Sequence, residues 1–209
     1  MHARVLFLKL DRLQLAEGLK TYREEVALTA RQQPGFAGML LLLDRDVGTA
    51  TSITLWDSAE ALAATDVSPY YVEQISRIGK YFAAAAERQD YEVGLLARGE
   101  TPIAPTFARV VRTSFHASKT DEGVRVYGET LIANARKQPG FAGVWLLIDR
   151  SEGKAFSISL WENEDAVSSG EISAYYIGQI FKLLPYVASL PDSEQCEVAY
   201  HFDAGHMLG

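Results

Sequence analysis

Apolar and polar positions along the first hundred residues follow two periodicities. Residues Arg4–Leu10 are mostly apolar and predict a strand. The apolar positions of the next segment recur every three or four residues and predict an amphipathic helix; they are Leu15, Leu19, Tyr22, Val26 and Ala30. Two further strands are expected over 38–44 and 51–56, joined by a hairpin that contains Gly48. A second helix should follow, capped by Asp57 and interrupted at 68–71, before a last strand over 91–97.

The same order of elements occurs a second time. The hexapeptide QPGFAG stands at 33–38 and again at 138–143, a spacing of 105 residues. This spacing also aligns 41–56 with 146–161 and 68–75 with 173–180, without a gap. Similarity of this extent indicates a duplication rather than a shared motif. We therefore predict a first repeat over 1–98, a linker with two prolines over 99–106, and a second repeat over 107–209.

The repeated hexapeptide predicts a corner between the first helix and the next strand. Pro34 disfavours the helical conformation of the residue before it, and Gly35 is suited to the left-handed turn that follows. Phe36 should then begin a strand, as Phe141 should in the second repeat. We interpret the hexapeptide as a structural feature that is needed twice because the unit is built twice.

The order βαββαβ is that of the ferredoxin-like fold, an antiparallel sheet with two helices on one face. Met39–Leu43 and Val144–Ile148 are apolar without interruption, so both faces of this strand need cover. Helices cover one face, and we expect the sheet of the other repeat to cover the second. The predicted fold class is α+β, with two ferredoxin-like repeats packed sheet to sheet as a single-chain dimeric α/β barrel. The repeats would form an intramolecular pseudo-dimer, and further homo-oligomerisation stays open.

Composition narrows the class of protein and of partner. With 48% hydrophobic and 22% charged residues the chain is typical of globular proteins, and no apolar run approaches the length that spans a bilayer. The short apolar run at the N-terminus lacks a cleavage site, so we interpret it as a strand. A net charge of −7 without a basic cluster argues against nucleic acid or membrane as partner. The single cysteine, Cys196, cannot form an internal disulfide, and we expect a cytoplasmic location and a small-molecule ligand.

Both repeats resemble the antibiotic biosynthesis monooxygenase family of small dimeric α/β-barrel proteins. The resemblance rests on QPGF after the first helix, on the strands that end in LWDSAEAL (55–62) and LWENEDAV (160–167), and on the SPYY and SAYY segments that follow. It implies an oxidoreductase, a cofactor-independent monooxygenase that acts on a small aromatic or polyphenolic molecule. The alternative is a non-catalytic small-molecule-binding or scaffolding protein with the same barrel.

The haem-degrading branch of that superfamily has a tryptophan on the sheet, an asparagine on the first strand and a histidine on the second helix. Trp56 and Trp161 match the tryptophan, but neither 4–10 nor 109–115 contains asparagine, and neither 58–71 nor 163–176 contains histidine. Haem is usually ligated by imidazole in such a site, so we expect no haem and no other cofactor. The four histidines of the chain show no metal-ligand spacing, and no metal site is predicted.

A pocket between sheet and helices is the expected ligand site. Ser52, Thr54 and Trp56 share one face of a strand, and Ser157, Ser159 and Trp161 share the corresponding face in the second repeat. Small hydroxyl residues beside a large indole leave room for a ligand, although each tryptophan could instead simply pack against its own helices. Tyrosines of the adjoining helix should reach the pocket from the other side; the candidates are Tyr70, Tyr175 and Tyr176.

We expect the second repeat to hold the working site. On its first strand, Val110, Arg112 and Ser114 share a face with His116 beyond them, whereas Val111, Thr113 and Phe115 form a more apolar face that should meet the other sheet. Arginine is costly to bury without a partner, so Arg112 and His116 are predicted to point toward the pocket. There Arg112 would hold a phenolate or carboxylate and His116 would take a proton. In the first repeat Phe7 would fill this space.

The predicted site residues are therefore of two kinds. The catalytic candidates are Arg112, His116 and Trp161. The ligand-binding candidates are Ser114, Ser157, Ser159, Tyr175, Tyr176, Trp56 and Tyr70. The alternative for Arg112 is that it reaches solvent or pairs with an acidic residue on a helix.

Overall fold

The computed structural model describes residues 1–171 and 174–205. The chain divides into two compact units that do not coincide with the sequence repeats. Unit 1 contains Met1–Tyr91 and the segment that begins at Val198, and unit 2 contains Glu92–Glu197. The last strand of each repeat, β4 (Glu87–Arg98) or β8 (Asp192–Asp203), therefore belongs partly to one unit and partly to the other. Each unit is described below by itself.

Unit 1 has the predicted order of elements. After β1 (His2–Lys9) the first helix consists of α1 (Leu15–Thr21), a π-helical segment η2 (Tyr22–Val26) and α2 (Ala27–Ala30). The hairpin strands are β2 (Phe36–Asp44) and β3 (Thr49–Trp56), followed by α3 (Ala59–Val67) and α4 (Pro69–Ile78). Short 3₁₀ turns, η1 (Arg12–Gln14) and η3 (Gly79–Tyr81), flank this set. Strand β3 pairs antiparallel with both β1 and β2.

Unit 2 repeats this arrangement. Strand β5 (Phe107–Ser114) and the turn η4 (Ala117–Lys119) lead into a helix made of α5 (Thr120–Tyr127), the π-helical η5 (Gly128–Ile132) and α6 (Ala133–Ala135). Then follow β6 (Phe141–Asp149), β7 (Lys154–Trp161), α7 (Glu164–Glu171) and α8 (Ala174–Leu183). Strand β7 lies between β5 and β6; the second half of β4 pairs with β6, and the first half of β8 pairs with β5.

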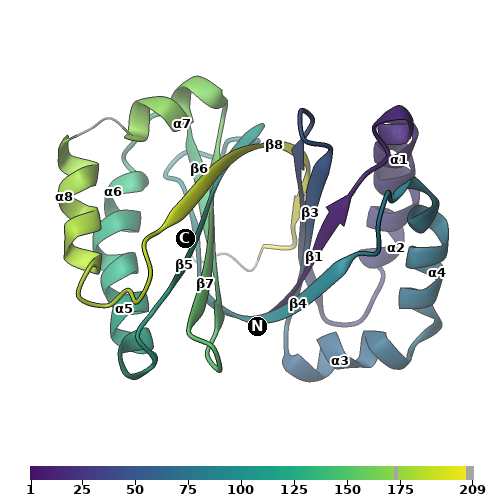
Figure 1. The fold of residues 1–209 in the computed structure, drawn as a ribbon, viewed down its shortest axis with the longest axis horizontal. Coiled ribbons are helices and arrows are strands. Elements are labelled where there is room, and N and C mark those ends of the chain that lie inside the picture. The colour runs from purple at the N-terminus through teal and green to yellow at the C-terminus, as the bar shows by residue number, and fades with distance from the viewer. Residues whose placement is uncertain (172–173, 206–209) are drawn as a thin grey trace. The chain divides into compact units, whose positions relative to one another are not determined.

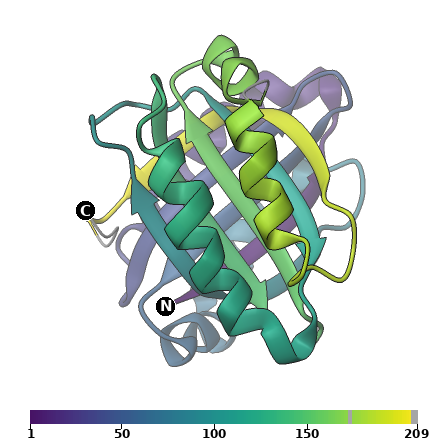
Figure 2. The same cartoon turned by 90° about the vertical axis from the view of Figure 1, so that its left-hand side faces the viewer.

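The sheet of each unit carries its helices on one face. In unit 1 the helices α1, α2 and α4 lie beside β1 and β3, and in unit 2 the helices α5, α6 and α8 lie beside β5 and β7 (Figure 1). Figure 2 looks onto unit 2 and shows the α5–α6 helix and α8 running across its strands. Hydrogen-bonded neighbours follow the order β1-β3-β2-β8-β5-β7-β6-β4, which closes as a barrel. The predicted α+β fold with two ferredoxin-like repeats is confirmed.

The hairpin strand β2 is buried on both faces, as its uninterrupted apolar sequence predicted. Met39, Leu41 and Leu43 belong to the apolar cluster beneath the helices of unit 1. Leu40 and Leu42, on the opposite face, are also buried. In unit 2 the segment Val144–Ile148 of β6 is buried throughout. Burial of this apolar area is the main favourable contribution to folding of such a strand.

The corner after the first helix is built as the repeated hexapeptide predicted. Gly35 has a φ of 74° and Gly140 a φ of 77°, a conformation that residues with a Cβ rarely adopt. A Cβ on Gly35 would lie 2.6 Å from the Cβ of Ala61, and one on Gly140 would lie 2.7 Å from that of Ala166. Both glycines therefore allow the following helix to approach the corner closely.

The cap of the second helix differs from the prediction. Ser58, and not Asp57, is the N-cap of α3, because its Oγ accepts a hydrogen bond from the Ala61 N–H at 3.1 Å. Asp57 lies one residue before it, where its backbone N–H donates to the Gly35 carbonyl at 2.8 Å. The predicted interruption is confirmed, since α3 ends at Val67 and α4 begins at Pro69, where the missing N–H of proline costs nothing.

Candidate functional site

Unit 2 encloses a cavity of about 440 Å³ between its sheet and its helices. Strands β5, β6 and β7 form one wall, and the α5–α6 helix and α8 form the other. Ligand cavities typically have volumes of about 300–1,000 Å³ and mostly apolar linings with a few polar groups. The lining has this character: it comprises Arg109, Val111, Thr113, Phe115, Tyr127, Leu131, Ile132, Ala135, Phe141, Leu146, Ala155, Ser157, Ser159, Trp161, Ile180, Leu183, Leu184, Val187, Pro191 and Ser193.

The predicted hydroxyl and indole face of β7 lines this cavity. Trp161 donates a hydrogen bond from Nε1 to the Ser159 Oγ at 3.0 Å, and its ring packs edge-on against Phe141. The Ser157 Oγ lies 2.6 Å from the Tyr127 hydroxyl, with either oxygen able to donate. Ser157, Ser159 and Trp161 therefore lie together on the cavity wall, and their contact with a ligand stays a prediction.

The predicted orientation of strand β5 is wrong. In the antiparallel register of β5 and β7, Arg109 is opposite Ser159 and Val111 is opposite Ser157. Directly opposite residues project to the same face of a sheet, so the face with Val111 lines the cavity and Arg112 belongs to the other face. Because the side-chain period of a strand is two, an error of one position turns every side chain to the wrong side.

The candidates on the other face of β5 and beyond its end have partners elsewhere. The Arg112 guanidinium pairs with Glu194 at 2.7 Å and lies over the ring of Phe156. The Ser114 Oγ donates to Ser189, and His116 is exposed after the end of the strand. None of the three contributes to the cavity lining. The alternative for Arg112, an acidic partner on a helix, is not what the structure shows, because Glu194 lies on strand β8.

Two further candidates cannot be placed in the same way. Tyr175 and Tyr176 belong to α8, but their side chains lie outside the described residues. Their predicted approach to the cavity stays a prediction. From the described part of α8, Ile180 and Leu183 line the cavity.

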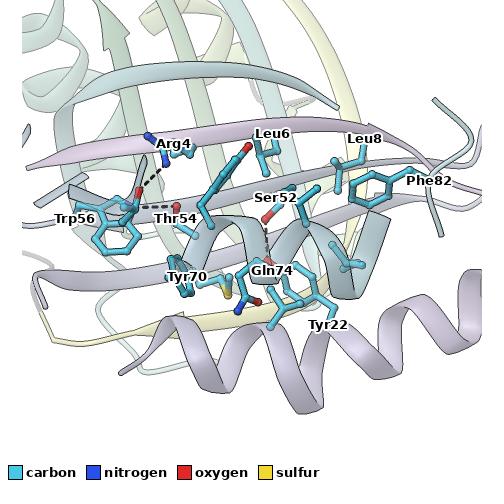
Figure 3. A pocket seen from close by; sticks show the side chains of 16 residues that line it. Arg4, Leu6, Leu8, Tyr22, Ser52, Thr54, Trp56, Tyr70, Gln74 and Phe82 are labelled. Atoms are coloured by element: carbon cyan, nitrogen blue, oxygen red, sulfur yellow. Dashed lines mark hydrogen bonds between the residues drawn. The ribbon is translucent and has the colours of Figure 1, made fainter. Parts of the chain in front are cut away.

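Unit 1 has a corresponding but much smaller cavity, of about 60 Å³. Trp56 and Tyr70 line it, and their rings make an edge contact with centroids 6.5 Å apart. The Trp56 Nε1 donates to the Thr54 Oγ1 at 3.0 Å (Figure 3), as its counterpart does in unit 2. Phe7 is not part of the lining, so the prediction that it fills this space is wrong.

The difference in volume follows from the residues that occupy equivalent positions. Leu6 and Leu8 on β1 correspond to Val111 and Thr113 on β5. Smaller side chains in unit 2 also replace Met39 and Phe82, whose counterparts are Val144 and Val187. Because interiors are close-packed, these truncations on one wall leave space that no other side chain fills.

A network of charges adjoins the unit 1 cavity. The Arg4 side chain is only 5% exposed; it pairs with Asp66 at 2.9 Å and with Asp90 at 3.1 Å, and donates to the Thr65 hydroxyl at 2.7 Å. Arg88 bridges the same two carboxylates. A hydrogen bond from Arg88 lowers the pKa of Asp66. Burial alone would raise the pKa of Asp90, but hydrogen bonds from Arg88 and Arg4 outweigh it and lower this pKa.

Two tyrosines of the unit 1 cavity are held in their neutral form. Burial raises the pKa of Tyr22, whose hydroxyl lies 2.9 Å from the Ser52 Oγ. Burial also raises the pKa of Tyr70 to about 12, against an opposing effect of Arg4. At neutral pH both residues therefore remain protonated phenols that are able to donate a hydrogen bond.

Comparison with known proteins bears on the fold. No protein-family model matches the chain. An uncharacterized protein of Mycobacterium tuberculosis H37Rv, Rv2557, is 24% identical over 152 residues, which cover 72% of this chain and 66% of the relative. The match thus spans just under two thirds of that relative's length.

Solved structures match over nearly the whole chain. A protein of Lactobacillus acidophilus NCFM, provisionally named a monooxygenase, has a TM-score of 0.78 at 11% identity, covering 98% of this chain and 96% of that one. An anthrone oxidase-like protein has a TM-score of 0.67 at 15% identity, covering 99% and 94%. A Listeria monocytogenes ferredoxin-fold protein related to antibiotic biosynthesis monooxygenases has a TM-score of 0.53 at 10% identity, covering 95% of each chain. The chain has the tandem-repeat fold of the antibiotic biosynthesis monooxygenase-like barrels.

Arg109 is a cavity residue that was not among the sequence-based candidates. It lies on β5, is largely buried and lines the unit 2 cavity. Its counterpart Arg4 lines the unit 1 cavity. A signal was present in the sequence, because arginine at positions 4 and 109 and tyrosine at positions 22 and 127 are retained in both repeats.

The described residues contain neither a metal-ligand cluster nor a membrane-spanning helix. Among them, no group of three or more histidine, cysteine, aspartate or glutamate side chains is placed to hold a metal ion. No helix within 1–171 and 174–205 combines the length and the apolar composition that crossing a bilayer requires.

Proposed function

We propose that the chain is a monooxygenase-type enzyme that oxidises a small, planar hydroxyaromatic molecule held in the cavity of unit 2. The observation that carries the proposal is a cavity of about 440 Å³ whose largely apolar lining includes Arg109. An aromatic ring would pack against the apolar wall, and a ring hydroxyl would face the guanidinium. The names of the structural neighbours support the reaction class.

Arg109 takes the role that the sequence analysis assigned to Arg112. A guanidinium stabilises a phenolate or enolate anion by charge-assisted hydrogen bonds. The effect is larger in a cavity from which the substrate displaces water, because the effective dielectric constant is lower there. Arg109 therefore favours ionisation of the bound substrate, and the resulting electron-rich ring carbon is the atom that reacts with oxygen.

The reaction balances without an external reductant when the reacting carbon is a ring methylene of the keto tautomer, the carbon that loses a proton and carries the charge in the enolate. Oxidation of that methylene to a carbonyl consumes one O₂; one oxygen atom enters the product, and the other leaves as water with the two hydrogens. Proton transfer contributes to such steps when a hydroxyl lies within reach of the substrate. The Tyr127–Ser157 pair on the cavity wall offers such hydroxyls.

A second candidate function is binding without turnover. It is favoured by the composition of the described lining residues, which include no histidine, aspartate or glutamate. General bases in proton abstraction are most often of these types. The chain would then be a ligand-binding or scaffolding protein that uses the same cavity.

Two measurements distinguish the two functions: oxygen consumption, and calorimetric binding of anthrone and a dihydroxyanthrone.

The matched variants transfer unit 1 residues into unit 2: Val111→Leu copies Leu6, Thr113→Leu copies Leu8 and Val187→Phe copies Phe82. We expect the triple variant to bind at least about tenfold more weakly, because the added volume occupies the cavity. Leu6→Val in unit 1 is the control and should leave binding unchanged.

The outcomes separate as follows. Binding with stoichiometric oxygen uptake supports the monooxygenase, and binding without uptake supports the second candidate. Both functions are refuted if neither anthrone nor the dihydroxyanthrone binds to the native chain. They are equally refuted if the triple variant binds these molecules as tightly as the native chain does.

A further inference from the structure

The cavity of unit 1 contains a buried amide without a partner. The Gln74 side chain on α4 is 94% buried, with a relative exposure of 6%. In the described part of the chain neither its Nε2 nor its Oε1 makes a hydrogen bond. Buried polar side-chain atoms are hydrogen-bonded in the great majority of native structures, so the pair calls for an explanation.

Two pairs of neighbouring polar side chains are hydrogen-bonded to one another. Tyr22 is bonded to Ser52, and Trp56 is bonded to Thr54. Figure 3 shows Gln74 close to Tyr22, Ser52 and Tyr70, on the helix side of the cavity. The remaining wall is largely apolar; its members are Leu6, Leu8, Val26, Met39, Ile75, Ile78 and Phe82. Gln74 therefore offers the cavity an unbonded donor and an unbonded acceptor side by side on one planar group.

We infer that unit 1 carries a second binding site, separate from the unit 2 cavity, that takes the amide end of a small neutral molecule and pairs it with Gln74. The ligand carbonyl would accept from Nε2–H, and the ligand N–H would donate to Oε1. An amide matches this pair because it presents an acceptor and a donor in one plane, whereas a carboxylate has no donor and an ammonium has no acceptor.

Size and charge restrict the ligand further. The volume of about 60 Å³ exceeds the roughly 10–15 Å³ that one water molecule needs, but it is far below that of unit 2. The charges at the cavity edge are internally matched, since Arg4 pairs with Asp66 and Asp90. Tyr70 is neutral at physiological pH. A small uncharged group therefore suits the site, and this inference is independent of the proposed reaction in unit 2.

The test uses the full-length chain and two isosteric probes, isobutyramide and 3-methyl-2-butanone. The ketone has a methyl group in place of the amide nitrogen, so it cannot donate to Gln74. We expect isobutyramide to bind about tenfold more tightly than the ketone, a difference that corresponds to one hydrogen bond of ordinary net strength. Gln74→Met keeps the length of the side chain and should abolish this preference. Gln179→Met, at the matched position of unit 2, should retain it.

A second readout keeps the test valid if Gln74→Met fails to fold. In the native chain, isobutyramide should shift the NMR resonances of the Gln74 side-chain NH₂ group, whereas the ketone should shift them much less. Equal affinities of the two probes, a preference that survives in folded Gln74→Met, or NH₂ resonances that respond to neither probe would overturn the inference. The last result would mean that ordered water alone occupies the cavity.

Discussion

Replacement of Arg4 by leucine tests the most buried charge network of unit 1. The Arg4 side chain is 5% exposed and contacts Asp66 and Asp90, whose side chains are 36% and 34% exposed. Removing one member of a buried ion pair typically costs about 3–5 kcal/mol, because the remaining charge is left buried. Here the carboxylates are partly exposed and keep their contacts with Arg88, which reduces the cost. We expect Arg4→Leu to lower the free energy of unfolding by about 2–3 kcal/mol.

The control is a surface pair of similar geometry. Arg112 pairs with Glu194, and these side chains are 36% and 47% exposed. Exposed pairs contribute about 0–1 kcal/mol, so Arg112→Leu should be nearly neutral. Urea unfolding, followed by circular dichroism and by tryptophan fluorescence, gives the free energy of unfolding of both variants, provided that the m value is unchanged. Coincident transitions in the two signals would show that the two units unfold together.

A double variant isolates the mechanism. If the cost of Arg4→Leu comes from stranded carboxylates, Arg4→Leu with Asp90→Asn should be less destabilised than the sum of the single variants. The reasoning would be refuted by an Arg4→Leu variant that loses no more stability than Arg112→Leu. It would equally be refuted by a double variant that loses the full sum, since the charges would then not be coupled.

Three other predictions follow from local geometry. Asp90 has a lowered pKa, so its contribution to stability is present above the unfolded-state pKa of about 3.9 and is lost as pH falls through the folded-state pKa. The free energy of unfolding should therefore fall less steeply with decreasing pH in Asp90→Asn than in the native chain. Gly140→Ala should destabilise by at least about 1–2 kcal/mol in thermal unfolding, because φ is 77° and the new Cβ would lie 2.7 Å from that of Ala166; a smaller effect would contradict the close approach. Ser58→Ala should cost about 1 kcal/mol in urea unfolding, whereas equal effects of Ser58→Ala and Asp57→Ala would contradict the observed cap.

The sequence by itself determined the features that depend on local patterns. The duplication, the corner at Gly35 and Gly140, the Gly48 hairpin and the two-sided burial of β2 all follow from residue type and periodicity within short segments. Even the clustering of Ser157, Ser159 and Trp161 was predictable, because alternate residues of one strand must share a face. Each of these conclusions needed no knowledge of a neighbouring strand.

Only the tertiary structure decided which face of β5 meets the cavity. Alternation within β5 is the same whether Arg109 or Arg112 faces inward, and the choice depends on the hydrogen-bonded register with β7, which places Val111 opposite Ser157. Cavity volume is equally non-local, since it is set by side chains far apart in the chain, such as Thr113 and Val187. Packing across elements, rather than periodicity along one element, distinguishes the large cavity of unit 2 from the small cavity of unit 1, where the Gln74 amide lies.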